Sequence, residues 1–260
     1  MFERLKKGWA LPASRDLDLD DPRTTLLRRQ IVREKRTLRQ IYEEWYQALA
    51  SEIPAGEGPV LEIGSGPGFL GEVIPEVITS EILPCPGVDL LLDGCALPLR
   101  QGSLRAIVMT DVFHHIAQPR RFLQESARCV REAGRLVMVE PWVTCWSRLI
   151  YARFHHEPFQ PEATDWEFPS TGPLSGANGA LPWIIMERDR GQFEAEFPQW
   201  RICLLRPQMP FRYLLSGGVS FKPLVPEWSF SFWRHLEGWL RPGMAHWAMF
   251  ALIVLRRTAA

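Results

Sequence analysis

Residues 60–70 read VLEIGSGPGFL, an apolar segment that runs into three closely spaced glycines. The apolar part, residues 59–63, is bounded by glycines and predicts a short buried strand. Glycines directly after a strand let the backbone turn sharply and approach a bound ligand closely. Open α/β sheets bind ligands at the carboxyl ends of their strands, so this stretch predicts a cofactor site at the end of a first strand.

The spacing of the glycines separates two kinds of cofactor. A dinucleotide fingerprint, G-x-G-x-x-G, would place its third glycine at position 69. Phe69 stands there, and the third glycine is Gly68. The acidic Glu62 just before the loop also suits an amino-acid ammonium group better than a pyrophosphate. The pattern therefore leaves a nicotinamide oxidoreductase only as a distant alternative.

The chain around this loop alternates strands with helices or tight crossovers, which predicts an α/β sheet. An amphipathic helix over 119–132 is expected to stop at Gly134, and short helices are expected over 70–77 and 191–197. Strands are predicted at residues 59–63, 78–82, 88–92, 106–110, 135–140, 200–205 and 248–256.

One helix is predicted from about residue 24 to the residues before Pro54, since Leu27, Ile31, Leu38 and Ile41 recur at helical spacing. Its remaining faces are strongly basic. Such a helix could be a solvated face, or could contact an anionic substrate, an acidic lipid surface or a carrier protein.

The domain organisation follows from a change in composition after Pro141. Residues 1–52 are expected to form an N-terminal helical cap on a domain of residues 53–260. Aromatic residues, Pro and Gly are frequent at about 142–190 and 207–243, which predicts two cap insertions. These caps could be packed cores of their own or could line an aromatic acceptor pocket. The expected substrate residues there are Trp142, Trp146, Tyr151, His155 and Trp166.

Composition limits the class of protein. The 260 residues carry 30 Lys and Arg against 30 Asp and Glu. This balance argues against a nucleic-acid-coating protein. The five cysteines show no paired spacing typical of zinc or redox sites. The N-terminus lacks the apolar region of a secretory signal, and the apolar run at 247–255 is too short to span a bilayer. These features predict a cytoplasmic protein, with a peripheral membrane contact as the alternative.

Four segments resemble one family. Residues 62–68 (EIGSGPG) resemble motif I of the class I S-adenosylmethionine-dependent methyltransferases, E/D-x-G-x-G-x-G. Residues 93–98 (DGCALP) resemble the segment after the third strand, residues 106–116 (AIVMTDVFHHI) the fourth strand with its LHH continuation, and residues 135–140 the fifth strand. Together they resemble the ubiquinone/menaquinone-type, or type 11, methyltransferases over about residues 58–141 and the final strand pair.

The resemblance implies a Rossmann-like, seven-stranded, mostly parallel sheet with an antiparallel C-terminal strand, and S-adenosyl-L-methionine as cofactor. Glu62 would orient the methionine end, Glu81 would accept hydrogen bonds from the ribose hydroxyls, and Asp93 from the adenine amino group. Thr110 and Asp111 would face the sulfonium. The implied cofactor-binding residues are Glu62, Gly64, Ser65, Gly66, Gly68, Glu81, Asp93, Gly94, Thr110 and Asp111.

The chain departs from the family in two places. Only residues 83–87 join the second and third strands, where the family usually has a helix. One sheet face is therefore expected to be bare or to be covered by the N-terminal helix. Arg105 stands where the family often has Asp. Neither departure touches the motif I glycines.

Methyl transfer from a sulfonium is an in-line displacement, so the protein supplies alignment and, where needed, a base. His114 and His115 follow the fourth strand, close to the expected methyl position. His115, His114 and Asp111 are the catalytic candidates, although the two histidines could instead only pack the loop. Residues 155–157 (HHE) are second candidates. No third ligand accompanies the histidine pairs at a spacing typical of metal sites, so no metal is expected.

The sequence therefore predicts transfer of a methyl group to a small, apolar or aromatic acceptor at O, C or N. A lipid-linked acceptor at the membrane surface and a non-catalytic S-adenosylmethionine-binding protein are the alternatives. The oligomeric state and the acceptor stay open.

Overall fold

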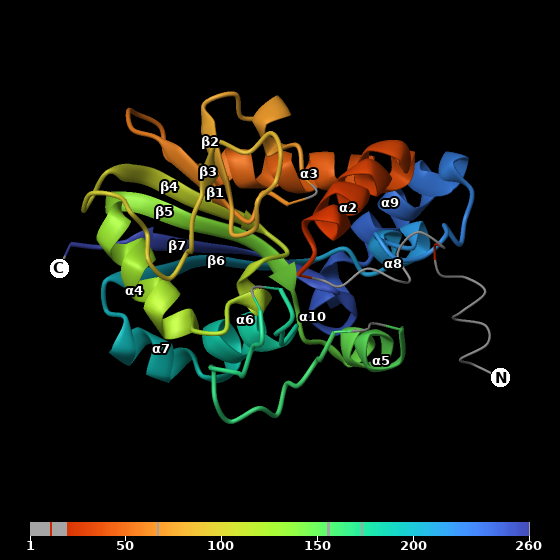
Figure 1. The fold of residues 1–260 in the computed structure, drawn as a ribbon. Helices are drawn as coiled ribbons and strands as arrows, with labels where there is room; N and C mark the ends of the chain where they lie inside the picture. The colour runs from red at the N-terminus through yellow and green to blue at the C-terminus, as the bar shows by residue number, and fades with distance from the viewer. Residues whose placement is uncertain (1–10, 12–19, 67, 155–156, 173, 260) are drawn as a thin grey trace.

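The computed structural model describes residues 11, 20–66, 68–154, 157–172 and 174–259. A seven-stranded sheet with the order β3-β2-β1-β4-β5-β7-β6 runs through the middle of the molecule (Figure 1). Strands β1 to β5 are parallel, and β7 is antiparallel to both of its neighbours. The predicted Rossmann-like sheet with a reversed C-terminal strand is confirmed. The strands are β1 Val60–Ile63, β2 Val77–Glu81, β3 Leu90–Leu91, β4 Leu104–Thr110, β5 Val130–Pro141, β6 Trp200–Gln208 and β7 Phe250–Arg257.

Helices cover both faces of the sheet (Figure 1). On one face, α4 (Pro119–Cys129), α6 (Leu181–Trp183) and α7 (Arg190–Glu196) enclose a hydrophobic core with the strands. On the other face, α3 (Arg36–Glu52) packs on β5 and β7. The remaining helical segments are α2 Pro22–Glu34, η2 Leu70–Glu72, η3 Phe113–His115, α5 Cys145–Phe154, η4 Ile184–Arg188, α8 Arg212–Ser216, η5 Glu227–Ser229, α9 Phe230–Trp239, η6 Arg241–Gly243 and α10 Met244–Trp247.

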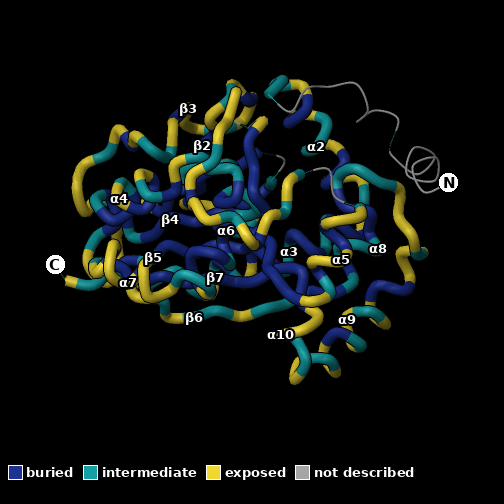
Figure 2. The backbone as a smooth tube through the Cα atoms, turned by 90° about the horizontal axis from the view of Figure 1, so that it is seen from below, coloured by how far each residue is buried: buried dark blue, intermediate teal, exposed yellow. Residues whose placement is uncertain are grey.

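Helix α3 is amphipathic, and its apolar face explains why it lies on the sheet. Leu38, Ile41, Trp45 and Leu49 recur every three or four residues, and each is at most 1% exposed. The central strands are buried from both sides (Figure 2). The N-terminal helix therefore covers this sheet face at β5 and β7, which was one of the two expected outcomes, whereas Ile82, Leu90 and Leu91 beside the short β2–β3 connection stay exposed.

The single helix predicted from residue 24 to residue 53 is wrong in one respect, because it is two helices. Helix α2 begins at Pro22 after Asp21, whose side chain accepts a hydrogen bond from the Arg23 backbone. The helix is interrupted at Lys35, whose backbone is extended. The Lys35 ammonium donates hydrogen bonds to the carbonyls of Gly218 and Phe221 at 2.5 and 2.7 Å, and burial lowers its pKa to about 8. The break between the two helices thus brings the Lys35 ammonium to the loop at 218–221, far away along the chain.

Two further local predictions are wrong. The helix expected over 70–77 is only the 3-10 turn η2, since β2 already begins at Val77. Helix α4 ends at Cys129 and not at Gly134, because the chain turns directly into β5. Gly134 instead lies in the irregular register between β4 and β5. A Cβ there would lie 2.8 Å from the carbonyl oxygens of Arg105 and Arg131, so the glycine is explained by close packing.

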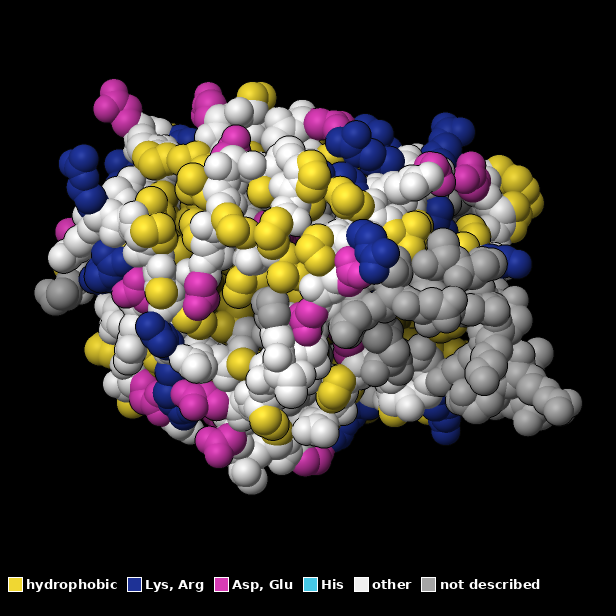
Figure 3. Space-filling view, in the orientation of Figure 1, with side chains coloured by type: hydrophobic (Ala, Val, Ile, Leu, Met, Phe, Trp, Pro, Cys, Tyr) yellow, Lys and Arg dark blue, Asp and Glu magenta, His cyan; other side chains and the backbone are white. Residues whose placement is uncertain are grey.

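Acidic and basic side chains are interspersed over the face shown in Figure 3. Among the described residues, no helix has the length and apolar character needed to cross a membrane.

Candidate functional site

A cavity of about 370 Å³ opens at the carboxyl ends of β1, β2 and β4, where the strand order reverses. All ten residues that the sequence predicts for the cofactor line it, among them the glycine loop, Glu81 and Asp93. The parallel sheet brings them together because they lie at or just after the carboxyl ends of β1, β2, β3 and β4. Their roles toward a cofactor stay predictions.

The glycine loop needs glycine for two reasons. Gly64 and Gly66 have φ values of +68° and +36°, a region that side chains disfavour. A Cβ on Gly64 would also lie 2.6 Å from the Val112 side chain, which follows β4. A Cβ on Gly66 would stand 3.4 Å from the Glu81 carboxylate, and both residues line the cavity.

The loop is held from two sides. The Glu81 carboxylate accepts hydrogen bonds from the backbone N–H groups of Gly66 and Ile82, both at 2.8 Å. From α2, the Arg29 guanidinium donates to the Gly66 carbonyl at 2.9 Å and to the Pro86 carbonyl at 2.6 Å. The cofactor loop and the β2–β3 connection are therefore fixed before any ligand binds.

The carboxylates along the cavity differ in their electrostatics. Burial raises the pKa of Glu62 to about 7, although a hydrogen bond from Ser65 acts in the other direction. Burial also raises the pKa of Glu81. Asp93 is exposed and accepts a hydrogen bond from the Cys95 backbone at 2.8 Å. The Thr110 hydroxyl is buried without a hydrogen-bond partner in the structure. The cavity lining thus offers carboxylate acceptors and one unsatisfied hydroxyl.

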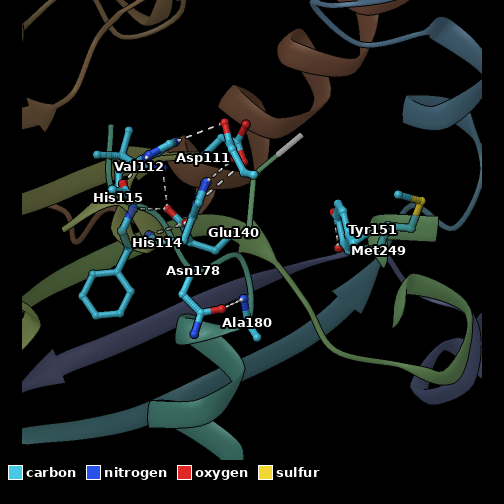
Figure 4. A network of polar contacts seen from close by, with 12 residues as sticks. Asp111, Val112, His114, His115, Glu140, Tyr151, Asn178, Ala180 and Met249 are labelled. Carbon is cyan, nitrogen blue, oxygen red and sulfur yellow. Dashed lines mark hydrogen bonds and ion pairs between the residues drawn. The ribbon is translucent and has the colours of Figure 1, made fainter. Parts of the chain in front are cut away.

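Glu140, at the end of β5, organises the turn after β4 (Figure 4). Its side chain is fully buried and accepts hydrogen bonds from the backbone N–H groups of Val112 and Phe113 at 2.8 and 2.7 Å. The same carboxylate accepts from Nδ1 of His114 at 2.8 Å. Nε2 of His114 lies 3.4 Å from Glu157. Burial alone would lower the pKa of His114, but the hydrogen bonds to Glu140 and Glu157 raise it well above its usual value.

His115 lies beside His114 but in different surroundings. Its ring centroid is 4.2 Å from that of His114, and its Nδ1 donates to the Gly176 carbonyl at 3.2 Å. Burial, together with the neighbouring positive His114, lowers the pKa of His115 to about 3. Its Nε2 therefore carries a lone pair, and the residue lines the cavity.

Asp111 completes this corner of the cavity. It has a φ of +61°, and its side chain is 30% exposed. Burial raises the pKa of Asp111 to about 6, although positive His114 acts in the opposite direction. Of the three catalytic candidates, Asp111 and His115 line the cavity, while His114 supports them from behind.

The predicted substrate residues are only partly brought to the cavity. Tyr151 lines it and donates a hydrogen bond to the Met249 carbonyl at 3.0 Å. Trp142 and Trp166 are packed in the core instead, the latter hydrogen-bonded to Asp189 through its indole nitrogen. Trp146 packs against Phe211 and Trp247, away from the cavity lining. His155 lies outside the described residues.

Several cavity residues were not singled out from the sequence. Arg28 and Tyr42 enter from α2 and α3, Tyr213 from α8, and Glu157 from the segment after α5. Glu140 could have been noticed as a charged residue at the end of a buried strand, beside the loop that carries His114. The others come from helices whose contact with the cavity depends on tertiary packing.

The basic residues of the N-terminal helices are used within the molecule. Arg28 lines the cavity, and Arg29 and Lys35 hold loops. Arg33 and Arg39 both pair with Glu72. Part of the basic face is therefore used for internal contacts, whereas Arg23, Arg33 and Arg36 stay exposed.

Replacing Glu140 by Leu is expected to lower the free energy of unfolding by about 3 kcal/mol, since two buried backbone donors and a charged histidine lose their acceptor. Chemical denaturation would measure the change. Glu76→Leu is the matched control, because Glu76 is 83% exposed. A Glu140 variant as stable as the control would contradict this role.

Comparisons with known proteins agree with this geometry. Residues 61–138 match the family model described as a methyltransferase domain. No protein of curated function matches the sequence significantly.

Solved structures share the fold at low sequence identity. Geranyl diphosphate C-methyltransferase from Streptomyces coelicolor A3(2), in complex with Mg2+, geranyl diphosphate and S-adenosyl-L-homocysteine, has a TM-score of 0.51 and 10% identity, over 96% of this chain and 89% of that chain. A geranyl diphosphate methyltransferase in complex with S-adenosylmethionine has a TM-score of 0.51 and 13% identity, over 96% of both chains. At this identity, both comparisons establish the fold alone.

Proposed function

We propose that this chain, which is a class I S-adenosylmethionine-dependent methyltransferase, transfers the methyl group of S-adenosylmethionine to a small apolar or aromatic acceptor bound in the same cavity. One observation carries the proposal. The ten predicted cofactor residues line a cavity that aromatic side chains also line. Those side chains are Tyr42, Tyr46, Tyr151, Phe154 and Tyr213.

The cofactor is proposed to lie along the glycine loop. Glu62, at the end of β1, would face the ammonium group of the methionine end, and Glu81 would accept from the ribose hydroxyls. Asp93 would accept from the adenine amino group. Gly64, Ser65, Gly66, Gly68 and Gly94 would allow close approach of the backbone, while Thr110 and Asp111 would face the sulfonium. The cofactor supplies the activated methyl group when it is bound.

The acceptor is proposed to lie between the sulfonium and the aromatic wall. Tyr151 and Phe154 come from α5, and Tyr213 comes from α8. Aromatic faces offer an apolar surface and would also attract the sulfonium charge by cation–π interaction. Because Tyr151 is buried and Tyr213 is partly buried, the wall would exclude water from one side of the reacting atoms.

The corner formed by Asp111, His114 and His115 is proposed to act on the nucleophilic atom of the acceptor. His115 would face that atom with Nε2, since its Nδ1 is held by the Gly176 carbonyl. His114, between Glu140 and Glu157, would position the neighbouring ring and the turn. Alignment of the acceptor with the methyl group is the main contribution expected of the protein.

No specific observation favours the alternatives. The alternative of a lipid-linked acceptor was based on the basic N-terminal helix. Arg29 and Lys35 of that region donate hydrogen bonds to loop carbonyls within the molecule. A binding protein without catalysis would not need His115 and Asp111 in the same cavity as the cofactor residues.

Cofactor affinity is expected to depend on pH through Glu62. Below pH of about 7 this carboxyl is protonated in the free protein, whereas the cofactor ammonium favours the ionised form. Binding should therefore release a proton at pH of about 6, and affinity should rise as the pH approaches 7. Above about pH 8 affinity should fall, as the α-amino group of the cofactor loses its charge. Calorimetry in buffers of different ionisation enthalpy measures the proton release.

Glu62→Gln is the control for this pH dependence. The variant should bind more weakly at neutral pH and should release no proton at about pH 6. Proton release that is unchanged in the variant would assign the titration to another group.

Methyl transfer itself is tested with S-adenosylmethionine labelled in the methyl group. Neutral and anionic phenols, amines and prenylated alcohols are offered as acceptors, and product formation is compared with a reaction lacking protein. Transfer to an apolar or aromatic member supports the proposal. Cofactor binding without transfer to any member would favour the non-catalytic alternative.

A further inference from the structure

Three side chains with ligand atoms for a metal meet at the methyl end of the cavity. His114, His115 and Glu157 place one candidate ligand atom each so that all three lie within 4.8 Å of one another. Nε2 of His114 is 3.4 Å from Oε2 of Glu157, and Nε2 of His115 is 3.7 Å from Oε1 of the same carboxylate. His115 and Glu157 line the cavity, and His114 is buried behind them.

These separations fit a common central cation. Ligand atoms about 2.1 Å from a tetrahedral cation lie about 3.4 Å from one another. The two histidine–carboxylate separations of 3.4 and 3.7 Å, each to a different oxygen of Glu157, are near this value, and all three candidate ligand atoms lie within 4.8 Å of one another.

The other ring nitrogens are oriented as metal ligands require. A metal-ligating histidine commonly donates its second ring N–H to a carboxylate or a backbone carbonyl, which directs the unprotonated nitrogen at the metal. Nδ1 of His114 donates to Glu140 at 2.8 Å, and Nδ1 of His115 donates to the Gly176 carbonyl at 3.2 Å. Glu140 also accepts from two backbone N–H groups, so it is fixed as the outer partner. Both histidines thus direct Nε2 toward Glu157, and a bound cation would replace the proton that His114 Nε2 holds against that carboxylate in the metal-free protein.

We propose that His114, His115 and Glu157 bind one divalent transition-metal cation, with a further coordination position open to the cavity. Two imidazoles and one carboxylate suit Zn2+, Fe2+ or Co2+ rather than Mg2+, which prefers an all-oxygen environment. No metal was expected from the sequence, because no third ligand accompanies the histidine pairs at a spacing typical of metal sites. The fold brings Glu157 to that pair.

The open position points to a class of acceptor. Resting on the proposed function, an acceptor with an oxygen atom, such as a phenol or an enol, would take this position with that oxygen on the cation. A cation at this point lowers the pKa of a bound hydroxyl, which favours the oxygen nucleophile at neutral pH. The two histidines then act by holding the cation.

Metal binding can be tested without any acceptor. The full chain is freed of metal with a chelator and titrated with Zn2+ by calorimetry, and with Co2+ while its visible absorption is followed. One equivalent is expected to bind. His115→Ala and Glu157→Gln should each weaken binding at least about 100-fold, and Glu140→Gln should weaken it about 10- to 100-fold. His235→Ala, a change at an exposed histidine on α9, should have no effect.

Binding of S-adenosyl-L-homocysteine to each variant reports whether its cavity is intact. No Zn2+ or Co2+ binding to wild-type protein that still binds this ligand would overturn the proposal. So would binding that His115→Ala and Glu157→Gln leave unchanged. Metal binding lost in both variants supports the site, even if no methyl transfer is found, so failure of the proposed function is recognised separately.

Discussion

Gly66→Val is expected to weaken S-adenosylmethionine binding at least about 100-fold while the protein stays folded. A valine would have to adopt the φ of +36° that Gly66 has. Its branched side chain would extend past the Glu81 carboxylate, only 3.4 Å from the Cβ position, into the cavity. The substitution therefore removes ligand space and also displaces the carboxylate proposed to bind the ribose. Calorimetric titration with S-adenosylmethionine measures the loss.

Gly71→Ala is the matched control, since nothing lies within 4 Å of the Cβ position of Gly71. It should bind the cofactor like the wild type. Circular dichroism and thermal unfolding would establish that the Gly66 variant is folded. Unchanged affinity in a folded Gly66→Val protein would remove this loop from the cofactor site.

His115→Ala is expected to lower the turnover number about 100- to 10,000-fold, with cofactor affinity changed by no more than about twofold. The His115 ring lines the cavity, where it is proposed to face the acceptor, and is held by Gly176 rather than by the glycine loop. Its loss should therefore affect the acceptor atom, whether the ring contacts it directly or through a bound cation. Steady-state kinetics with an identified acceptor, together with calorimetry for the cofactor, would separate the two quantities.

His235→Ala serves as the control for this experiment, because His235 is exposed on α9. It should leave both turnover and affinity unchanged. An equal loss of turnover and cofactor affinity in His115→Ala, or no loss of either, would exclude His115 from the catalytic residues.

The meeting of the cofactor candidates in one cavity could be predicted from sequence for a physical reason. They lie at or just after the ends of strands, and parallel strands place their carboxyl ends at one edge. Glycine spacing at 64–68 and the acidic Glu81 and Asp93 are therefore local signals that the topology alone brings together. The strands could be predicted for a similar reason, because each is a short apolar run in the sequence. The observed strands differ from the predicted ones only in where they begin and end, as at β3, which spans Leu90–Leu91 instead of 88–92.

The acceptor side could not be predicted in the same way. Tryptophans after Pro141 indicated an aromatic pocket, but a large apolar ring fills a core as readily as it lines a cavity. Trp142 and Trp166 pack in the core, whereas tyrosines of α3, α5 and α8 line the cavity. Which rings reach the cavity depends on helix packing, and no periodicity in the sequence reports that.

The carboxylates that contact His114 could not be predicted from sequence either. Glu140 ends a strand and Glu157 lies beyond a helix, and only the tertiary fold places both against one imidazole. The break at Lys35 is a further case. Helical periodicity continues through the break, and the contact that holds Lys35 is made by the loop at 218–221.

The measurement that tests the central claim most directly is calorimetric titration of the purified chain with S-adenosylmethionine and, separately, with NADH. The account predicts saturable binding of one equivalent of S-adenosylmethionine and no binding of NADH. Binding of NADH, or no binding of S-adenosylmethionine or S-adenosyl-L-homocysteine by the folded protein, would contradict it.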